Sequence, residues 1–215
     1  NRADKKNRLF SLSFVLKKSI DKATTSVYNK NMNKLYLNVY EKQRAFYENR
    51  PKMKKALYFA DKIATWAIAV IYAAMCVYIT FRRPDYIDPD KNGASFTIYL
   101  DAKDFFRTIV LPLLSFAAVS LLRYLFDEKR PYEREITPLY EKKTIGRSFP
   151  SRHLSCAATA AFIAFCYFTP AGIIITICGA VLFYTRFACG WHFPRDLFAG
   201  AIIGCLCAFA GLSVV

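Results

Sequence analysis

The chain has 215 residues, of which 31 are Lys or Arg and 16 are Asp or Glu, so its formal net charge is +15. Residues 1–55 hold 15 of the basic residues and four acidic ones, and long apolar blocks separated by short charged loops follow from Ile63 onward. This segregation excludes a uniformly basic globule, and the basic part lacks the stacking and zinc-ligand signatures of nucleic-acid binding. Beside apolar blocks it indicates membrane lipids as partners and no nucleic acid.

Five apolar segments approach the roughly 20 residues that a helix needs to cross the hydrocarbon of a bilayer. They are residues 56–81, 105–126, 150–169, 171–188 and 197–215. Pro150 at the start of the third segment and Pro170 just after its end are the usual punctuation of a helix. Pro112 predicts a kink in the second segment. We therefore expect an all-α, multi-pass transmembrane helical bundle of about five spans.

Upstream of the first span, Asn33–Lys55 mixes Tyr, Leu, Val and Phe with Lys and Arg, as an interfacial amphipathic helix does. We expect two parts, a basic N-terminal tail with this helix over residues 1–55 and a transmembrane domain over residues 56–215. If all five segments cross, the tail and the loops 127–149 and 186–196 share one side of the membrane. The loop 84–104 then lies on the other side.

Three groups of polar residues stand out on the predicted tail side. They are Arg123 with Arg130 and Pro131; Pro150-Ser151-Arg152-His153; and Thr185-Arg186 with His192 and Asp196. Seven residues are about two helical turns, so we expect the guanidinium groups of Arg123 and Arg130 to stack along one helix face. Taken singly, each group has an ordinary explanation, as a rim anchor, a helix cap or a structural His–Asp pair. Their coincidence on one side favours a shared site that uses both histidines of the chain.

The positive groups in this set suit the binding of a phosphate. Arg123, Arg130 and Arg186 can grip a dianionic phosphate with bidentate hydrogen bonds. The start of the third helix offers unpaired backbone N–H groups, and Ser151 adds a hydroxyl beside them. No ligand set for a metal ion is apparent, and the seven cysteines show neither zinc nor disulfide spacing. We expect no cofactor and no metal, with the arginines supplying the positive charge.

The two histidines suit the chemical step. His192 can act as the nucleophile if Asp196 accepts its other ring N–H, which fixes the tautomer and supports the cation that forms. His153 can then protonate the departing oxygen as a general acid. The residues therefore predict phosphoryl transfer at the rim of a membrane domain.

The three groups resemble the signature motifs of type 2 phosphatidic acid phosphatases, whose usual forms are Lys-x6-Arg-Pro, Pro-Ser-Gly-His and Ser-Arg-x5-His-x3-Asp. That superfamily also includes bacterial undecaprenyl-pyrophosphate phosphatases, glucose-6-phosphatase and vanadium haloperoxidases. The resemblance implies a helical bundle, a covalent phosphohistidine on His192 and no metal requirement. It implies phosphate binding by Arg123, Arg130, Ser151 and Arg186, and by the backbone around Arg152.

This sequence departs from the family's pattern at three positions. Arg123 replaces Lys, which keeps the charge but not the shape, and Thr185 replaces Ser, which keeps a hydroxyl. Arg152 replaces Gly and adds bulk and charge beside the phosphate. That side chain favours a second phosphate, as in a pyrophosphate, or simply points to solvent.

The expected function is hydrolysis of a lipid phosphate ester or pyrophosphate, with undecaprenyl pyrophosphate, phosphatidylglycerophosphate and phosphatidic acid as candidate substrates. The alternatives are a non-enzymatic membrane protein with a decayed site and a vanadium haloperoxidase, whose known members are mainly soluble. The sequence does not indicate the oligomeric state.

Two arguments about the orientation of the site disagree. The tail and the site loops hold 25 Lys and Arg against five in residues 82–107, which predicts a cytoplasmic site by the positive-inside rule. Several of the 25 belong to the site itself, and long tails follow the rule poorly. The resemblance implies a bacterial plasma membrane and a site on its extracytoplasmic face, which is the expectation we adopt.

Overall fold

The computed structural model describes residues 30–81, 102–134 and 136–214 of the chain. Contacts divide these residues into two units, of which the first ends at Phe46 and the second begins at Tyr47. Most of helix α2 (Lys30–Glu48) forms the first unit, and helices α3 to α8 belong to the second. The start of the predicted tail and most of the predicted 84–104 loop lie outside the described residues. The predicted domain boundary after residue 55 stays a prediction.

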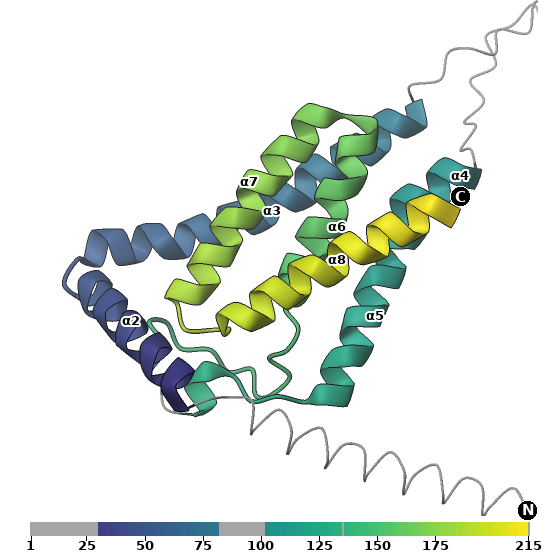
Figure 1. Cartoon of the computed structure of the whole chain (residues 1–215). Coiled ribbons are helices and arrows are strands. Elements are labelled where there is room, and N and C mark those ends of the chain that lie inside the picture. The colour runs from purple at the N-terminus through teal and green to yellow at the C-terminus, as the bar shows by residue number, and fades with distance from the viewer. Residues whose placement is uncertain (1–29, 82–101, 135, 215) are drawn as a thin grey trace, which may run out of the picture. The chain divides into compact units, whose positions relative to one another are not determined.

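Helices occupy all five segments predicted to cross the membrane (Figure 1). The second unit consists of α3 (Pro51–Phe81), α4 (Ala102–Phe105), a π-helical turn (Phe106–Val110), α5 (Leu111–Phe126), a 3-10 turn (Pro131–Glu133), α6 (Arg152–Tyr167), α7 (Thr169–Ala188) and α8 (Pro194–Val214). Candidate spans by length and composition are Pro51–Ile79, Ala102–Glu133, Thr169–Ala188 and Pro194–Ser213. The expectation of an all-α, multi-pass membrane bundle is confirmed.

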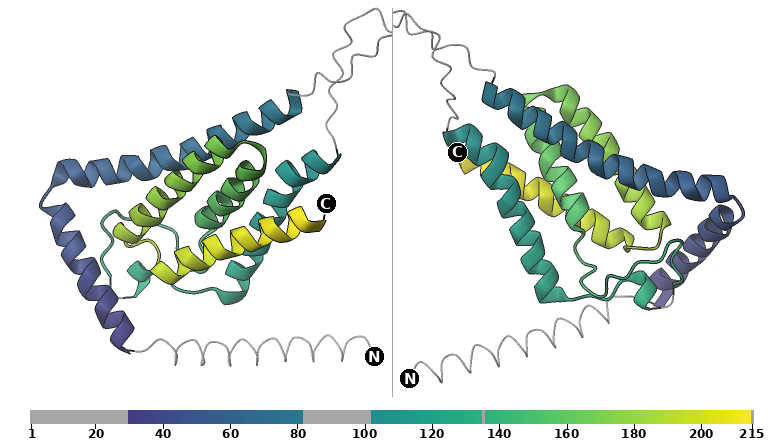
Figure 2. Two further views of the ribbon diagram at one scale, coloured as in Figure 1. Left: turned by 45° about the horizontal axis from the view of Figure 1, so that its top comes forward. Right: turned by 180° about the vertical axis from the view of Figure 1, so that it is seen from behind.

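Helix α6 takes the place of the third predicted span but is shorter than α3, α7 and α8, and unlike α5 it is not extended by a preceding helical turn. Its 16 residues extend about 24 Å at 1.5 Å per residue, less than the roughly 30 Å of a bilayer core. It packs against α3, α5, α7 and α8, and it lies among them in the views of Figures 1 and 2. Because its neighbours surround it, α6 need not match the hydrocarbon thickness with its own length.

Helices α3 and α8 begin earlier than hydropathy alone predicts, and both of these starts use a proline. The amphipathic segment expected over residues 33–55 is divided, since α2 ends at Glu48 and α3 begins at Pro51. α8 likewise begins at Pro194 and includes charged Asp196 in its first turn. Proline suits a first helical turn because its missing N–H would have no partner there. Hydropathy therefore located the apolar part of each helix rather than its first residue.

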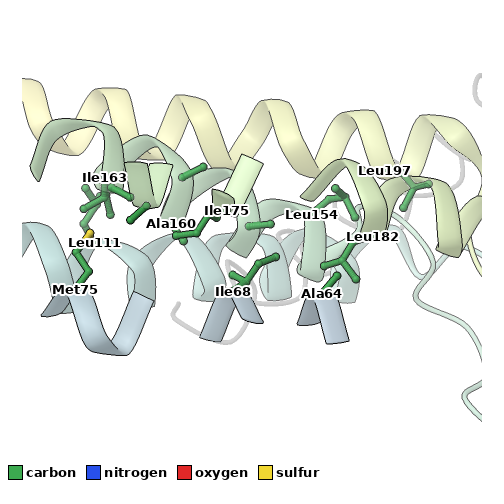
Figure 3. Packing of buried hydrophobic residues seen from close by; sticks show 14 residues of the cluster. Ala64, Ile68, Met75, Leu111, Leu154, Ala160, Ile163, Ile175, Leu182 and Leu197 are labelled. Atoms are coloured by element: carbon green, nitrogen blue, oxygen red, sulfur yellow. The ribbon is translucent and has the colours of Figure 1, made fainter. Parts of the chain in front are cut away.

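The core of the bundle is made of small and branched side chains. Ile163, Ile175, Leu182 and Leu197 are fully buried there, together with a row of alanines from α6 (Figure 3). Large apolar side chains on the outer faces, by contrast, are exposed, such as Trp66 with 69% of its surface accessible. Exposed apolar surface of this extent is typical of helices that face lipid.

Close contact between α6 and α8 depends on two glycines spaced four residues apart. A Cβ atom added to Gly200 would lie 2.4 Å from the backbone oxygen of Ser151, and one added to Gly204 would lie 2.3 Å from that of Ser155. The approach also allows the Thr159 hydroxyl to donate to the Gly204 carbonyl at 3.1 Å. Small residues at this spacing are a common device for packing helices in membranes.

We expect Gly200→Ala and Gly204→Ala to lower the thermal stability and folded yield of the detergent-solubilised protein, because a methyl group meets rigid backbone at either position. Gly179→Ala is the matched control, since its added Cβ would lie 3.7 Å from Ala157 Cβ, an ordinary contact. The measurement is monodispersity on size exclusion after heating. Equal behaviour of all three variants would contradict this account of the packing.

Candidate active site

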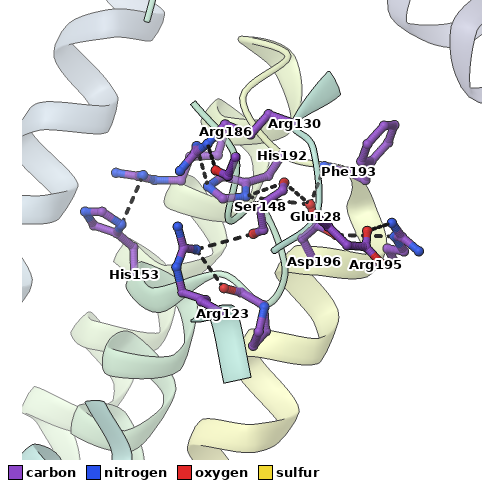
Figure 4. Close-up of polar contacts among 12 residues, drawn as sticks. Arg123, Glu128, Arg130, Ser148, His153, Arg186, His192, Phe193, Arg195 and Asp196 are labelled. Atoms are coloured by element: carbon purple, nitrogen blue, oxygen red, sulfur yellow. Dashed lines mark hydrogen bonds and ion pairs between the residues drawn. The ribbon is translucent and has the colours of Figure 1, made fainter. Parts of the chain in front are cut away.

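The predicted site residues gather at one end of the bundle, where four helices begin or end. Arg123 lies in the last turn of α5, Arg186 in the last turn of α7 and Asp196 in the first turn of α8, while Ser151 is the residue before α6. The N-terminal part of α3 reaches the same end, where Leu57 packs with Ala188 and Trp191. The structure thus brings these predicted residues together, and Figure 4 shows Arg123, Arg186 and Asp196 among them.

The two arginines of the first motif do not share a helix face, contrary to the sequence-based expectation. α5 ends at Phe126, and Asp127 takes a left-handed conformation that turns the chain away. Arg123 donates from Nη1 to the carbonyl oxygens of Ser148 at 3.3 Å and Pro150 at 2.9 Å. Arg130 instead precedes a 3-10 turn and donates from Nε to the Gly146 carbonyl at 3.1 Å. A folded loop, rather than helical periodicity, therefore places the two guanidinium groups.

His192 is buried, with its two ring nitrogens in different surroundings. Nε2 lies 3.4 Å from Nη1 of Arg130, and Nδ1 lies 3.5 Å from the Ser148 hydroxyl and 3.7 Å from Asp196 Oδ2. Arginine only donates, so this contact assigns the Nε2 lone pair to the side of Arg130 and the proton to Nδ1. A nucleophilic imidazole needs this tautomer, with its unprotonated nitrogen aimed at the cations.

Burial lowers the pKa of His192 from 6.5 to about 4, the nearby Asp196 opposes that shift, and the positive charge of Arg130 adds to it. The imidazole is therefore neutral at neutral pH. Neutrality matters because only the unprotonated ring carries the lone pair that attacks phosphorus.

His153 is exposed beside the cluster and contacts Arg186. Nη1 of Arg186 lies 3.2 Å from Nδ1 of His153, so by the same reasoning Nδ1 accepts and the proton of the neutral ring lies on Nε2. His153 is the second residue of α6, and Arg186 is in the last turn of α7. The packing of these two helices therefore brings the second histidine beside the third motif.

Ser151 and Arg152 lie at the start of α6 in different environments. Ser151 donates its backbone N–H to the carbonyl of Asp196 at 2.8 Å, whereas its buried hydroxyl has no hydrogen-bond partner among the residues that the structure describes. A buried hydroxyl without a partner at a helix N-terminus suits the binding of an oxyanion. The side chain of Arg152 is exposed and lies over the ring of Phe116, 5.6 Å from its centroid.

Asp61 is a site residue that the sequence analysis missed. It is buried in α3 with 2% of its surface accessible, and its carboxylate lies 3.2 Å from Nε and 3.4 Å from Nη2 of Arg186. It also accepts a hydrogen bond from the Thr185 hydroxyl at 3.1 Å. The available signal was an acidic residue at the edge of an apolar span, where buried charges are paired or functional.

Ser148 and Lys142 were missed as well. The Ser148 hydroxyl donates to Asp196 Oδ2 at 2.5 Å and therefore lies between the carboxylate and the imidazole that were expected to pair directly. Lys142 lies over Trp191, 4.2 Å from the ring centroid, and burial and the nearby Arg186 lower its pKa to about 8. Both belong to the loop before α6, where they had no helical or motif spacing to mark them.

Further contacts fasten this loop to the start of α8. Arg195 forms an ion pair with Glu128 and lies 3.4 Å from Asp196 Oδ1. The backbone N–H of Ser148 donates to the carbonyl of Glu128 at 2.8 Å. These bonds hold the loop across the end of the bundle and so fix the position of the residues within it.

Taken together, the helices and the cluster define a class, namely integral-membrane helical proteins in which a cluster of buried arginines faces a neutral, buried imidazole. The identity within that class comes from comparison of sequences. A family model described as the PAP2 superfamily matches residues 105–215, more than half of the chain. The chain therefore belongs to the PAP2 superfamily, which confirms the resemblance seen in its motifs.

Solved structures agree with this assignment at the level of the fold. The transmembrane PAP2-type phosphatidylglycerolphosphate phosphatase of Bacillus subtilis is 15% identical with a TM-score of 0.59, covering 96% of this chain and 93% of that one. LpxE of Aquifex aeolicus is 21% identical with a TM-score of 0.57, covering 82% and 94%. Comparison with curated protein sequences gave no match.

We expect Asp61→Asn to reduce the binding of phosphate or vanadate by the detergent-solubilised protein about tenfold or more and to lower its thermal stability. The reason is that removing one partner of a buried ion pair leaves the other charge uncompensated, at a cost of about 3–5 kcal/mol. Lys62→Gln is the control, since it changes an exposed charge on the same helical turn. Anion binding that stays at the wild-type level in Asp61→Asn would show that Arg186 is held without the carboxylate.

Proposed function

We propose that this protein is an integral-membrane lipid phosphatase that hydrolyses a phosphate monoester or pyrophosphate through a phosphohistidine on His192, without a metal ion. The observation that carries the proposal is the orientation of His192, whose Nε2 lone pair faces Arg130 while its Nδ1 faces Ser148 and Asp196. Membership of the PAP2 superfamily and the fold shared with a phosphatidylglycerolphosphate phosphatase support it.

In the first step, His192 Nε2 attacks phosphorus, and the bond between phosphorus and the leaving oxygen breaks. Arg123, Arg130 and Arg186 stabilise the charge on the equatorial oxygens. The Nδ1 proton of His192 is held by Ser148 and Asp196, which support the positive charge that develops on the ring.

His153 supplies the proton that the leaving oxygen takes up. In the free site the ring is neutral, and its Nδ1 accepts from Arg186. When a dianionic phosphate binds beside both groups, Nδ1 takes up a proton from water in place of the contact with Arg186, because the phosphate stabilises the imidazolium form that a general acid requires. Water then attacks the phosphorus of the phosphohistidine, and the bond between phosphorus and Nε2 of His192 breaks. His153 accepts a proton from that water, and inorganic phosphate leaves as His192 returns to its neutral form.

The candidate substrates are undecaprenyl pyrophosphate, phosphatidylglycerophosphate and phosphatidic acid. Phosphate release from these lipids in detergent with EDTA present is the test of the proposal, and we expect release to persist with EDTA because arginines supply the positive charge. His192→Ala should lower kcat by roughly a thousandfold or more on every substrate. Wild-type activity in His192→Ala would refute the phosphohistidine.

The two histidine variants should differ on an aryl phosphate, whose leaving group needs no proton. We expect His153→Ala to retain a much larger fraction of wild-type activity on p-nitrophenyl phosphate than on an alkyl phosphate. The reason is that the proposed role of His153 is to protonate the leaving oxygen. His192→Ala should lose both activities. A protein that releases no phosphate from any of these compounds would favour the non-enzymatic alternative.

We further propose that the site faces the extracytoplasmic side of a bacterial plasma membrane, as the resemblance implies. Ile145, with 82% of its surface accessible, lies in the site loop and provides a probe. We expect a membrane-impermeant maleimide to label Ile145→Cys in intact spheroplasts, with the wild-type protein as control for the native cysteines. Labelling that requires lysis would place the site in the cytoplasm, as the charge count predicts.

A further inference from the structure

A pocket adjoins the proposed catalytic site on the side of α5. It has a volume of about 540 Å³ and is lined by residues of α5, by the loop after it, by the segment 144–147 and by Arg152. Arg123 lines this pocket and also belongs to the first signature motif. The pocket therefore lies directly beside the proposed phosphate-binding arginines. The proposed mechanism uses none of the other pocket side chains.

One face of α5 carries Ser120, which lines the pocket, and two aromatic residues on which arginines of the pocket are stacked. Phe116, Ser120 and Tyr124 are spaced four residues apart and therefore lie along one helix face. The guanidinium carbon of Arg152 lies 5.6 Å from the ring centroid of Phe116, and that of Arg147 lies 5.6 Å from the ring centroid of Tyr124. The two aromatic rings thus hold two guanidinium groups on either side of Ser120.

Positive charge dominates the lining of the pocket. The lining contains four basic side chains and two carboxylates. The basic ones are Arg123, Lys129, Arg147 and Arg152, and the carboxylates are those of Asp127 and Glu133. Glu133 is engaged elsewhere, since its oxygens accept hydrogen bonds from the backbone N–H groups of Gly146 and Arg130. Asp127 lies 4.0 Å from Nε of Arg147, with both side chains more than half exposed. The basic groups therefore outnumber the acids available to neutralise them.

The Ser120 hydroxyl is an independent sign of a ligand. Its oxygen is buried at the pocket and has no hydrogen-bond partner among the described residues. A buried hydroxyl usually finds a partner in a folded protein. Between two guanidinium groups, the partner that fits best is an anionic oxygen.

We propose that this pocket binds a second phosphoryl group of the substrate, on the leaving-group side of the phosphate that His192 attacks. This inference rests on the proposed function and deepens it, because it selects lipids with two phosphoryl groups over lipids with one. The residues that determine this specificity are Arg147 and Arg152. Arg152 stands where the family's motif has glycine. The second group is joined to the first directly, as in a diphosphate, or through a short polyol, as in a phosphodiester headgroup.

The kinetic test compares matched lipids that differ by one phosphoryl group. Farnesyl diphosphate against farnesyl phosphate tests the direct linkage, and phosphatidylglycerophosphate against phosphatidic acid tests the spaced one. For one of these pairs, we expect the wild-type ratio of kcat/KM to favour two phosphates and to fall about tenfold in Arg147→Ala and in Arg152→Gly. Arg134→Ala is the control, since it removes an exposed arginine stacked on Phe193 outside the pocket.

A binding test separates failure of this inference from failure of the proposed function. The measurement uses His192→Ala protein, because binding can be measured without turnover. Methylenediphosphonate should bind to it more tightly than inorganic phosphate does. Adding Arg147→Ala should remove most of that difference in affinity. If wild type shows no hydrolysis yet the binding difference is present, the proposed function fails and the subsite stands. If Arg147→Ala and Arg152→Gly leave both the binding difference and the kinetic ratios at their starting values, the second phosphate site is overturned.

Discussion

Three arginines buried at one end of an apolar bundle impose the main constraint on this structure. A buried charge must be paired or hydrogen-bonded, because the hydration that it loses is not replaced by apolar neighbours. Arg186 faces the carboxylate of Asp61, and Arg123 donates to two backbone carbonyls. Arg130 donates to the carbonyl of Gly146 and faces His192. The cations therefore keep fixed positions from which they can act on an incoming anion.

The packing of α6 connects this charged end to the membrane domain. Its first residues carry the second motif, and its body packs against α3, α5, α7 and α8. Gly200 allows the backbone of Ser151 to approach α8, where the Ser151 N–H donates to the carbonyl of Asp196. The third motif is thereby joined to the second through backbone contacts, so the distance between them depends on helix packing rather than on a flexible loop.

In the proposed mechanism the two histidines have different roles, and their contacts differ accordingly. His192 is buried, and its Nε2 accepts from an arginine while its Nδ1 faces Ser148 and Asp196. His153 is exposed, and its Nδ1 accepts from Arg186. The pocket beside Arg123 extends the same cationic surface along the end of α5.

The sequence by itself determined the helical class and the chemical inventory of the site. Apolar segments long enough for a bilayer form helices because lipid offers no partner for an unpaired backbone group, and that requirement is local. Tertiary structure decided how the parts meet. Asp61 reaches Arg186 across 125 residues, Ser148 comes between His192 and Asp196, and Arg123 and Arg130 meet through a loop rather than along one helix. These contacts follow from helix packing and loop folding, for which neither residue spacing nor hydropathy carries a signal.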